Sequence, residues 1–135
     1  MSRKILIAED ERDIIDMIRV VFEARGYDVV AAYDGLGALD LAKKETPDLI
    51  ITDLLMPGIT GLELCRRLRT DEDLCRTPII VITSVTQDSD MADGFWRIAT
   101  DSDDFVTKPF DPYDLADRAE RLINKGENEE GNLGL

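Results

Sequence analysis

The chain has 135 residues, of which 16 are basic, 29 are acidic and none is histidine, and its formal net charge is −13. A surface this acidic repels phosphate backbones and anionic lipids, so we expect no direct binding to nucleic acid or to a membrane. A chain without histidine has no histidine-ligated zinc site, no histidine-based triad and no role as a phosphohistidine carrier. The length suits one domain, and no apolar segment could cross a bilayer or act as a signal peptide, so a cytoplasmic protein is expected.

Five short apolar runs, each bounded by glycine, proline or charged residues, predict five strands. They lie at residues 4–8, 28–32, 49–53, 79–83 and 105–107. The third run is apolar or β-branched until it stops at a carboxylate. Such a run is typical of a strand that helices cover on both faces of a parallel sheet.

Between these runs, apolar residues recur at helical spacing and predict helices with one buried face. The residues expected on the buried faces are Ile14, Ile18, Val21, Phe22, Leu36, Leu39, Ala42, Leu62, Cys65, Leu68, Leu115, Ala119, Leu122 and Ile123. Gly26 is expected to close the first helix. Asp34 is expected to cap the second helix, and Thr46-Pro47 to stop it.

The later helices have start and stop signals of their own. Thr60 and Glu63 form a capping box before the third helix. Residues 89–98 predict a short fourth helix. Gly126 is expected to end the fifth helix and the domain, which would span residues 1–126, and a flexible acidic tail would follow over 127–135.

Five strands alternating with five helices are typical of an α/β protein with a doubly wound, flavodoxin-like parallel sheet. Right-handed crossovers place the carboxyl ends of all parallel strands at one edge. That edge would collect Glu9, Asp10, Asp53, Thr83 and Lys108. Ligand sites of open α/β sheets lie at such edges.

The residues at this edge indicate phosphoryl chemistry that depends on a divalent cation. Carboxylates that converge on one edge repel one another unless a cation joins them, and short carboxylates suit Mg²⁺, which shares its shell with phosphate. An aspartate beside Mg²⁺ favours attack on phosphorus, which gives an aspartyl phosphate at Asp53. Lys108 would offer a fixed positive charge to the phosphoryl oxygens, and Thr83 a hydroxyl donor.

The sequence resembles the response-regulator receiver domains of two-component signalling from about Lys4 to Asn124. The motifs that carry the resemblance are Glu9-Asp10, Asp53 with Met56-Pro57 and Gly61, Thr83, and Lys108-Pro109-Phe110. The resemblance implies the strand order 2-1-3-4-5 and a signalling module rather than an enzyme. With no output domain after the last helix, we expect a stand-alone receiver or a fragment of a larger regulator. A stand-alone receiver would act by docking on an effector protein or on the next histidine phosphotransferase of a relay.

The resemblance also implies a role for each site residue. Asp53 would accept a phosphoryl group from a sensor histidine kinase or a histidine phosphotransferase. The implied Mg²⁺ ligands are Glu9, Asp10, Asp53 and the backbone carbonyl of Leu55. The implied phosphate and switch residues are Thr83, Lys108 and Phe105, and the implied structural residues are Pro57, Gly61 and Pro109, with a cis Lys-Pro bond. An effector protein would dock on the fourth helix, fifth strand and fifth helix.

Three features depart from the family pattern near that docking face. Lys108 lies 25 positions after Thr83, a longer separation than the family pattern predicts. Asp101-Ser102 stands where Gly-Ala usually precedes the fifth strand, which removes a residue that tolerates left-handed geometry. Ser84 replaces the usual alanine. The departures leave the phosphorylation chemistry intact and concern the identity of the partner.

Two other function classes fit the sequence less well. A haloacid-dehalogenase-type phosphohydrolase would need an Asp-x-Asp motif after the first strand, where this chain has Glu9-Asp10-Glu11. A flavodoxin-like carrier would need a phosphate-binding loop at the same place, and three acids there would repel phosphate.

Overall fold

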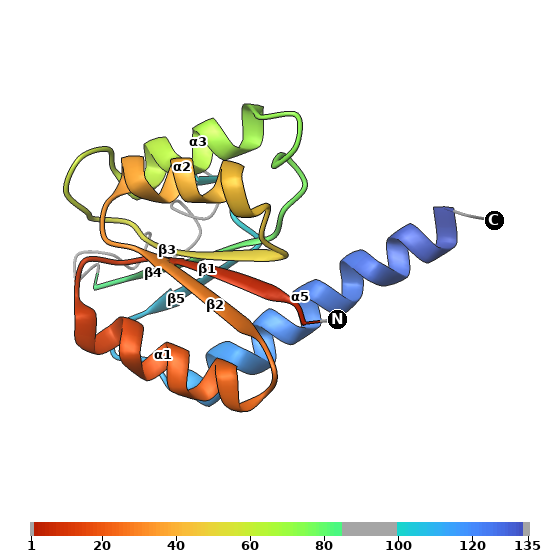
Figure 1. The fold of residues 1–135 in the computed structure, drawn as a ribbon, viewed down its shortest axis with the longest axis horizontal. Coiled ribbons are helices and arrows are strands. Elements are labelled where there is room, and N and C mark those ends of the chain that lie inside the picture. Colours follow the sequence, from red (N-terminus) through yellow and green to blue (C-terminus); the bar gives the residue numbers. More distant parts are fainter. Residues whose placement is uncertain (1, 85–99, 134–135) are drawn as a thin grey trace.

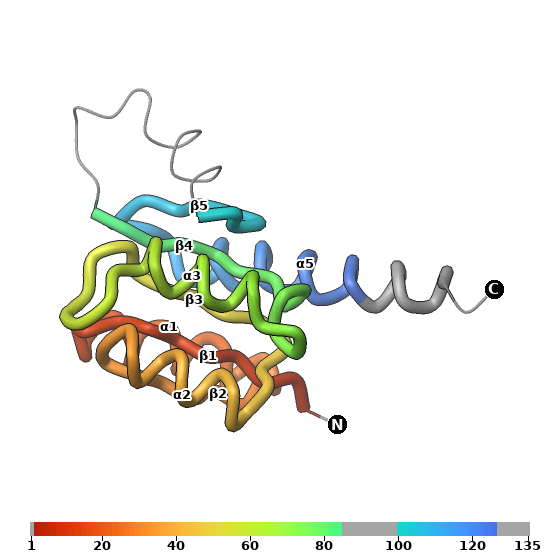
Figure 2. Tube along the Cα trace, turned by 90° about the horizontal axis from the view of Figure 1, so that it is seen from above, coloured from red at the N-terminus to blue at the C-terminus, as the bar shows by residue number. Residues whose placement is uncertain are grey.

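The computed structural model describes residues 2–84 and 100–133, and it contains a five-stranded parallel sheet in the order β2-β1-β3-β4-β5. The strands are β1 (Lys4–Ala8), β2 (Asp28–Ala32), β3 (Leu49–Asp53), β4 (Ile79–Thr83) and β5 (Asp104–Thr107). Figure 2 shows them in this order, from β5 at the top of the view to β2 at the bottom. The expected α/β sheet and its strand order are therefore confirmed.

Helices cover both faces of the sheet. The described helices are α1 (Arg12–Ala24), α2 (Gly35–Glu45), α3 (Gly61–Thr70) and α5 (Pro112–Leu133). The α2 and α3 helices lie on one face, and α1 and α5 lie on the other (Figure 1). The fourth helix expected at residues 89–98 lies outside the described residues.

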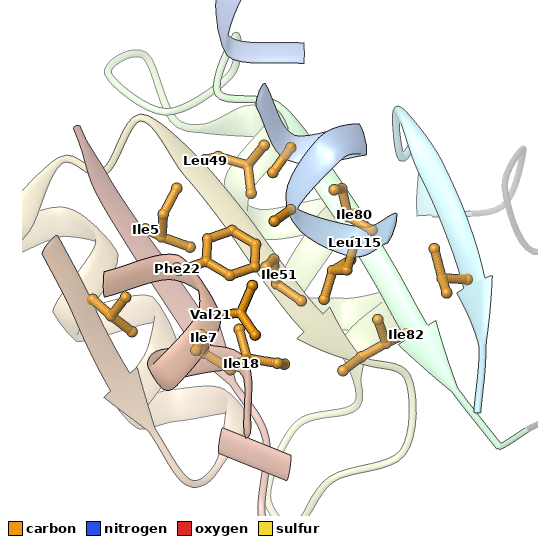
Figure 3. Packing of buried hydrophobic residues seen from close by; sticks show 14 of the residues in the cluster. Ile5, Ile7, Ile18, Val21, Phe22, Leu49, Ile51, Ile80, Ile82 and Leu115 are labelled. Carbon is orange, nitrogen blue, oxygen red and sulfur yellow. The ribbon is translucent and has the colours of Figure 1, made fainter. Parts of the chain in front are cut away.

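The core forms two apolar clusters, one on each face of the sheet. Alternate residues of β3 enter different clusters, because successive side chains of a strand point to opposite faces: Ile51 joins the cluster under α1 and α5, and Ile50 joins the other. Phe22 of α1 packs in the first cluster with Ile5 and Ile51 (Figure 3). Burial on both faces keeps β3 and its terminal carboxylate in a fixed place.

The expected caps at Asp34 and Thr60 are present, but only the Thr60 half of the expected capping box forms, because the Glu63 carboxylate accepts hydrogen bonds from Arg66 and Arg67 instead. The Asp34 carboxylate accepts the N–H of Gly37 at 2.7 Å, and the Thr60 hydroxyl accepts the N–H of Glu63 at 3.1 Å. Gly26 follows α1 with a φ of +92°, a conformation that glycine adopts without steric cost.

Two expectations about the helices are wrong. Leu36 was expected on the buried face of α2, but it is 50% exposed, while Ala38, Leu39 and Ala42 are buried. Successive residues of a helix are turned by about 100°, so Leu36 lies to the side of the buried stripe that Gly35, Ala38, Leu39 and Ala42 form. The fifth helix continues through Gly126 to Leu133. A glycine inside a helix costs only about 1 kcal/mol relative to alanine, and that cost does not end a helix by itself.

None of the helices in the described part of the chain is long and apolar enough to cross a membrane.

Candidate functional site

The carboxyl edge of the sheet gathers side chains from four strand ends. Glu9 follows β1, and its N–H donates to the carbonyl of Ala32 in β2 at 3.0 Å. Asp53 is the last residue of β3, and Thr83 is the last residue of β4. Lys108 follows β5, and its N–H donates to the Thr83 carbonyl at 2.8 Å. Neighbouring strands therefore hold each of these residues through backbone hydrogen bonds.

Three carboxylates form a cluster at the centre of this edge. Glu9, Asp10 and Asp53 each place one carboxylate oxygen within 4.8 Å of the others. Glu9 and Asp53 are buried, and Asp10 is exposed. The donor set consists of oxygens only, and the exposed Asp10 leaves room for water, which fits Mg²⁺ because this ion prefers oxygen ligands and keeps several waters.

Lys108 neutralises part of the negative charge of this cluster. Its Nζ lies 2.6 Å from Oε1 of Glu9, 2.8 Å from Oδ2 of Asp53 and 3.7 Å from Oε2 of Glu11. Burial of the ammonium group works to lower the pKa of Lys108, but the hydrogen bonds to Asp53 and Glu9 outweigh it and the pKa is raised. The lysine therefore stays a cation at neutral pH.

Glu9 is the most deeply buried acid of the cluster. Its Oε2 accepts the N–H of Asp10 at 2.8 Å and that of Glu11 at 3.2 Å, so the side chain closes a turn after β1. Burial raises the pKa of Glu9 despite the opposing hydrogen bond from Lys108, and repulsion from Asp53 adds to the rise. A cation in the cluster would favour its ionised form.

Both oxygens of the Asp53 carboxylate have partners. Oδ1 accepts the N–H of Leu55 at 3.1 Å, and Oδ2 accepts from Lys108. The side chain is 7% exposed, so it is held in one orientation with limited access from solvent. These contacts fix the direction in which the carboxylate could meet a reactant.

Thr83 has a buried hydroxyl with no hydrogen-bond partner within the part of the chain that is described. A buried unpaired hydroxyl costs about 1–3 kcal/mol, and such groups often mark a functional site. The cost disappears when an acceptor oxygen arrives next to the hydroxyl.

The β3–α3 loop, residues 54–60, passes over this edge. Its turn contains Gly58 with a φ of +82°, directly after Pro57. A Cβ placed on Gly61 would lie 2.2 Å from the carbonyl oxygen of Asp53, so only glycine fits at the start of α3. The Leu55 side chain is 63% exposed at the rim.

Two further residues implied by the resemblance lie around the site. Phe105 pairs with Val81 in the sheet, two residues before Thr83, and is half-buried against the cluster under α2 and α3. The Lys108–Pro109 peptide bond is cis, as the resemblance implied.

Sequence reasoning missed two residues at this edge. Glu11 approaches Lys108, and the run of three acids after β1 was the signal for it. Gly35 packs against the β3–α3 loop, and the only local signal is that glycine follows the helix cap Asp34.

Comparison with known proteins identifies the kind of domain that shares this architecture. The family model described as the response regulator receiver domain matches residues 5–120. A signal receiver domain of a signal transduction histidine kinase from Syntrophus aciditrophicus is 32% identical, with a TM-score of 0.83 and 92% of each chain covered.

Two other solved structures are similar over most of their length. The chemotaxis response regulator CheY4 of Vibrio cholerae is 30% identical, with a TM-score of 0.80, and the match covers 90% of this chain and 99% of that one. The receiver domain of the sensor histidine kinase PA1611 from Pseudomonas aeruginosa, with a magnesium ion coordinated in its active site cleft, is 27% identical. Its TM-score is 0.81, and the match covers 92% of this chain and 99% of that one.

Proposed function

The chain belongs to the response regulator receiver domain family, and from this premise we propose that Asp53 is its phosphoacceptor. The observation that carries the proposal is the Asp53 carboxylate itself, buried at a strand end between Lys108 Nζ at 2.8 Å and the N–H of Leu55 at 3.1 Å. Receiver domains are signalling modules. The chemistry to be explained is therefore a single phosphoryl transfer onto the protein.

Asp53, Lys108 and Thr83 would each have a different role in this transfer. An oxygen of Asp53 forms a bond to phosphorus while the bond from phosphorus to the donor breaks, and the donor keeps the electron pair. Lys108 lies against both Asp53 and Glu9, so its ammonium group can pair with the phosphoryl oxygens when they arrive at Asp53. The Thr83 hydroxyl can donate to one of these oxygens and thereby gain the partner that it lacks.

We propose Mg²⁺ as the cation of this site. Glu9, Asp10, Asp53 and the backbone carbonyl of Leu55 would hold it, and the carboxylate cluster supports this assignment. When bound, Mg²⁺ would offset the negative charge of the phosphoryl group as it approaches the carboxylates. The magnesium ion of the Pseudomonas receiver agrees with this choice of metal.

The proposed partners are proteins. A sensor histidine kinase or a histidine phosphotransferase would donate the phosphoryl group. An effector would dock on a surface formed by β5, α5 and the segment between β4 and β5. Within the chain, residues 1–126 would form the receiver, and residues 127–135 would be an acidic extension that begins inside α5.

The test is phosphorylation of the purified protein by acetyl phosphate with Mg²⁺, followed by intact mass. The parent is expected to gain one phosphoryl group, and Asp53→Asn none, because the amide is a far weaker nucleophile than the carboxylate. Asp28→Asn, an exposed aspartate at the start of β2, is the matched control and should label like the parent. Equal labelling of Asp53→Asn would refute the proposal.

A further inference from the structure

We infer that Gly35 is a positioning residue for the proposed metal site, an inference that rests on the proposed function. Gly35 is the buried first residue of α2. It lies against the β3–α3 loop, which carries the backbone carbonyl of Leu55. Gly35 acts on the site through this loop. Because glycine has no side chain, the loop can pack directly on the start of α2, and this packing keeps the Leu55 carbonyl at the proposed metal site.

The contact between Gly35 and the loop leaves no room for a side chain. A Cβ placed on Gly35 would lie 2.4 Å from Cγ1 of Ile59 and 2.4 Å from its carbonyl oxygen. Carbon atoms in contact are normally about 3.5–4.0 Å apart. The Ile59 side chain could rotate away, but its backbone oxygen could not. Any larger residue at position 35 would therefore push the loop itself.

A second contact ties the same helix start to the same loop. The N–H of Gly35 donates to the carbonyl oxygen of Pro57 at 3.4 Å. This N–H belongs to the first turn of α2, where backbone donors have no partner inside the helix. The loop supplies that partner, so α2 and the loop are fitted to one another at two points.

A push at Ile59 would reach the metal site because the loop is closed at its base. The N–H of Gly61 donates to the carbonyl of Leu54 at 2.8 Å. With both ends held beside Asp53, a displacement must be absorbed by the residues between them, which include Leu55. The N–H of Leu55 also donates to Oδ1 of Asp53, so the same movement would turn the carboxylate.

The neighbouring glycine of α2 provides a matched control. A Cβ on Gly37 would first meet Oδ1 of Asp34 at 3.1 Å and then Cβ of Ala32 at 3.8 Å, with no loop atom among the nearest three. Gly37→Ala therefore makes the same chemical change in the same helical turn without pushing the loop. Alanine also favours the helix, so this variant is expected to fold.

The experiment measures Mg²⁺ affinity by titration calorimetry for the parent, Gly35→Ala and Gly37→Ala, with Asp10→Ala as the variant that loses a proposed ligand. We expect Gly35→Ala to weaken Mg²⁺ binding about tenfold, as changes behind metal ligands commonly do. Gly37→Ala should stay within about twofold of the parent, because it leaves the loop untouched.

Two further readouts separate positioning from a general loss of stability. In acetyl phosphate labelling, the Mg²⁺ concentration for half-maximal rate should rise for Gly35→Ala, while the rate at saturating Mg²⁺ stays close to the parent's. In the metal-free protein, amide exchange at Gly61 should be faster in Gly35→Ala than in Gly37→Ala, because the displaced loop strains the Gly61–Leu54 hydrogen bond.

Parental Mg²⁺ affinity in a folded Gly35→Ala variant would overturn the inference and leave the proposed function intact. A parent that binds no Mg²⁺ would overturn both. If Gly35→Ala does not fold, the double variant Gly35→Ala/Ile59→Ala decides, because it removes the contact with Cγ1 and keeps the contact with the backbone oxygen of Ile59, so the loop is still pushed. The double variant should bind Mg²⁺ more weakly than Ile59→Ala alone, and equal affinity of these two variants would overturn the inference.

Discussion

Two buried threonines at the carboxyl edge show how one residue type serves different purposes. Thr52 and Thr83 are both fully buried, and they belong to the neighbouring strands β3 and β4. The Thr52 hydroxyl donates to the carbonyl of Asp53 at 2.9 Å. The Thr83 hydroxyl has no partner among the residues that the structure describes. Thr52 thus stabilises the strand end. The unpaired Thr83 hydroxyl instead destabilises the fold until a ligand supplies an acceptor oxygen.

Replacing each threonine by valine, which is nearly the same size, should therefore change stability in opposite directions. Thr83→Val removes an unpaired buried hydroxyl and should raise the free energy of unfolding by about 1 kcal/mol. Thr52→Val breaks a hydrogen bond and should lower it by about 1 kcal/mol. Urea unfolding of the unphosphorylated proteins measures both.

The same variants test the role of Thr83. Beryllofluoride, which stands in for the phosphoryl group, should bind Thr83→Val more weakly than the parent, because one hydroxyl donor is missing. A Thr83→Val protein that is less stable than the parent would show that the hydroxyl is already satisfied.

Among the helices and loops, the ends of elements carry most of the local strain. Two residues other than glycine have a positive φ in the described ranges 2–84 and 100–133: Thr46 at 44° and Asp101 at 52°. Thr46 caps the end of α2, and Asp101 stands before β5, where the family pattern has glycine. The sequence departure at Asp101 therefore leaves the left-handed conformation in place and puts an aspartate into it.

Glycine at either position should stabilise the fold. Thr46→Gly is expected to raise the free energy of unfolding by about 1 kcal/mol, because a β-branched residue is poorly suited to the left-handed region. Asp101→Gly should gain less, because aspartate tolerates this region better and its removal also breaks an exposed pair with Arg69. The midpoints of urea unfolding measure both, and a loss of stability in Thr46→Gly would contradict this reasoning.

At the scale of the whole molecule, β5 and the residues just before it are bound to neighbouring elements at both edges of the sheet. At the site end, Lys108 donates to the Thr83 carbonyl. At the opposite edge, Arg69 of α3 donates to the carbonyls of Thr77 and Asp101 at 2.7 and 2.9 Å and to the Asp103 carboxylate at 3.0 Å. A change at the site is therefore expected to move the Lys108 end of β5, whereas the contacts of Arg69 hold the opposite end.

Amide hydrogen exchange tests this expectation. Addition of beryllofluoride with Mg²⁺ should change exchange over residues 84–110, since Thr83 and Lys108 both move toward the phosphoryl mimic and Phe105 follows. Residues 38–45 in α2, beyond the first turn of that helix, are the internal control and should change little. Exchange over 84–110 that is indifferent to beryllofluoride would argue against the switch.

The sequence alone determined where the described strands lie along the chain and which acids and lysine stand at one edge, whereas the order of the strands in the sheet was implied by the family resemblance. Strands of this kind are encoded locally, in short apolar runs with breakers on either side, and parallel connections then bring their carboxyl ends together. The caps at Asp34 and Thr60 were also predictable, because a cap depends on residues three positions apart.

Only the tertiary structure decided how these residues meet. Lys108 pairs with Glu9, which lies 99 positions earlier, and with Asp53, which lies 55 positions earlier. The exposure of Leu36, the unpaired hydroxyl of Thr83 and the contact of Gly35 with Ile59 likewise depend on what distant segments place beside each residue. Local periodicity and propensity carry no information about such neighbours, because they arise only when the helices pack on the sheet.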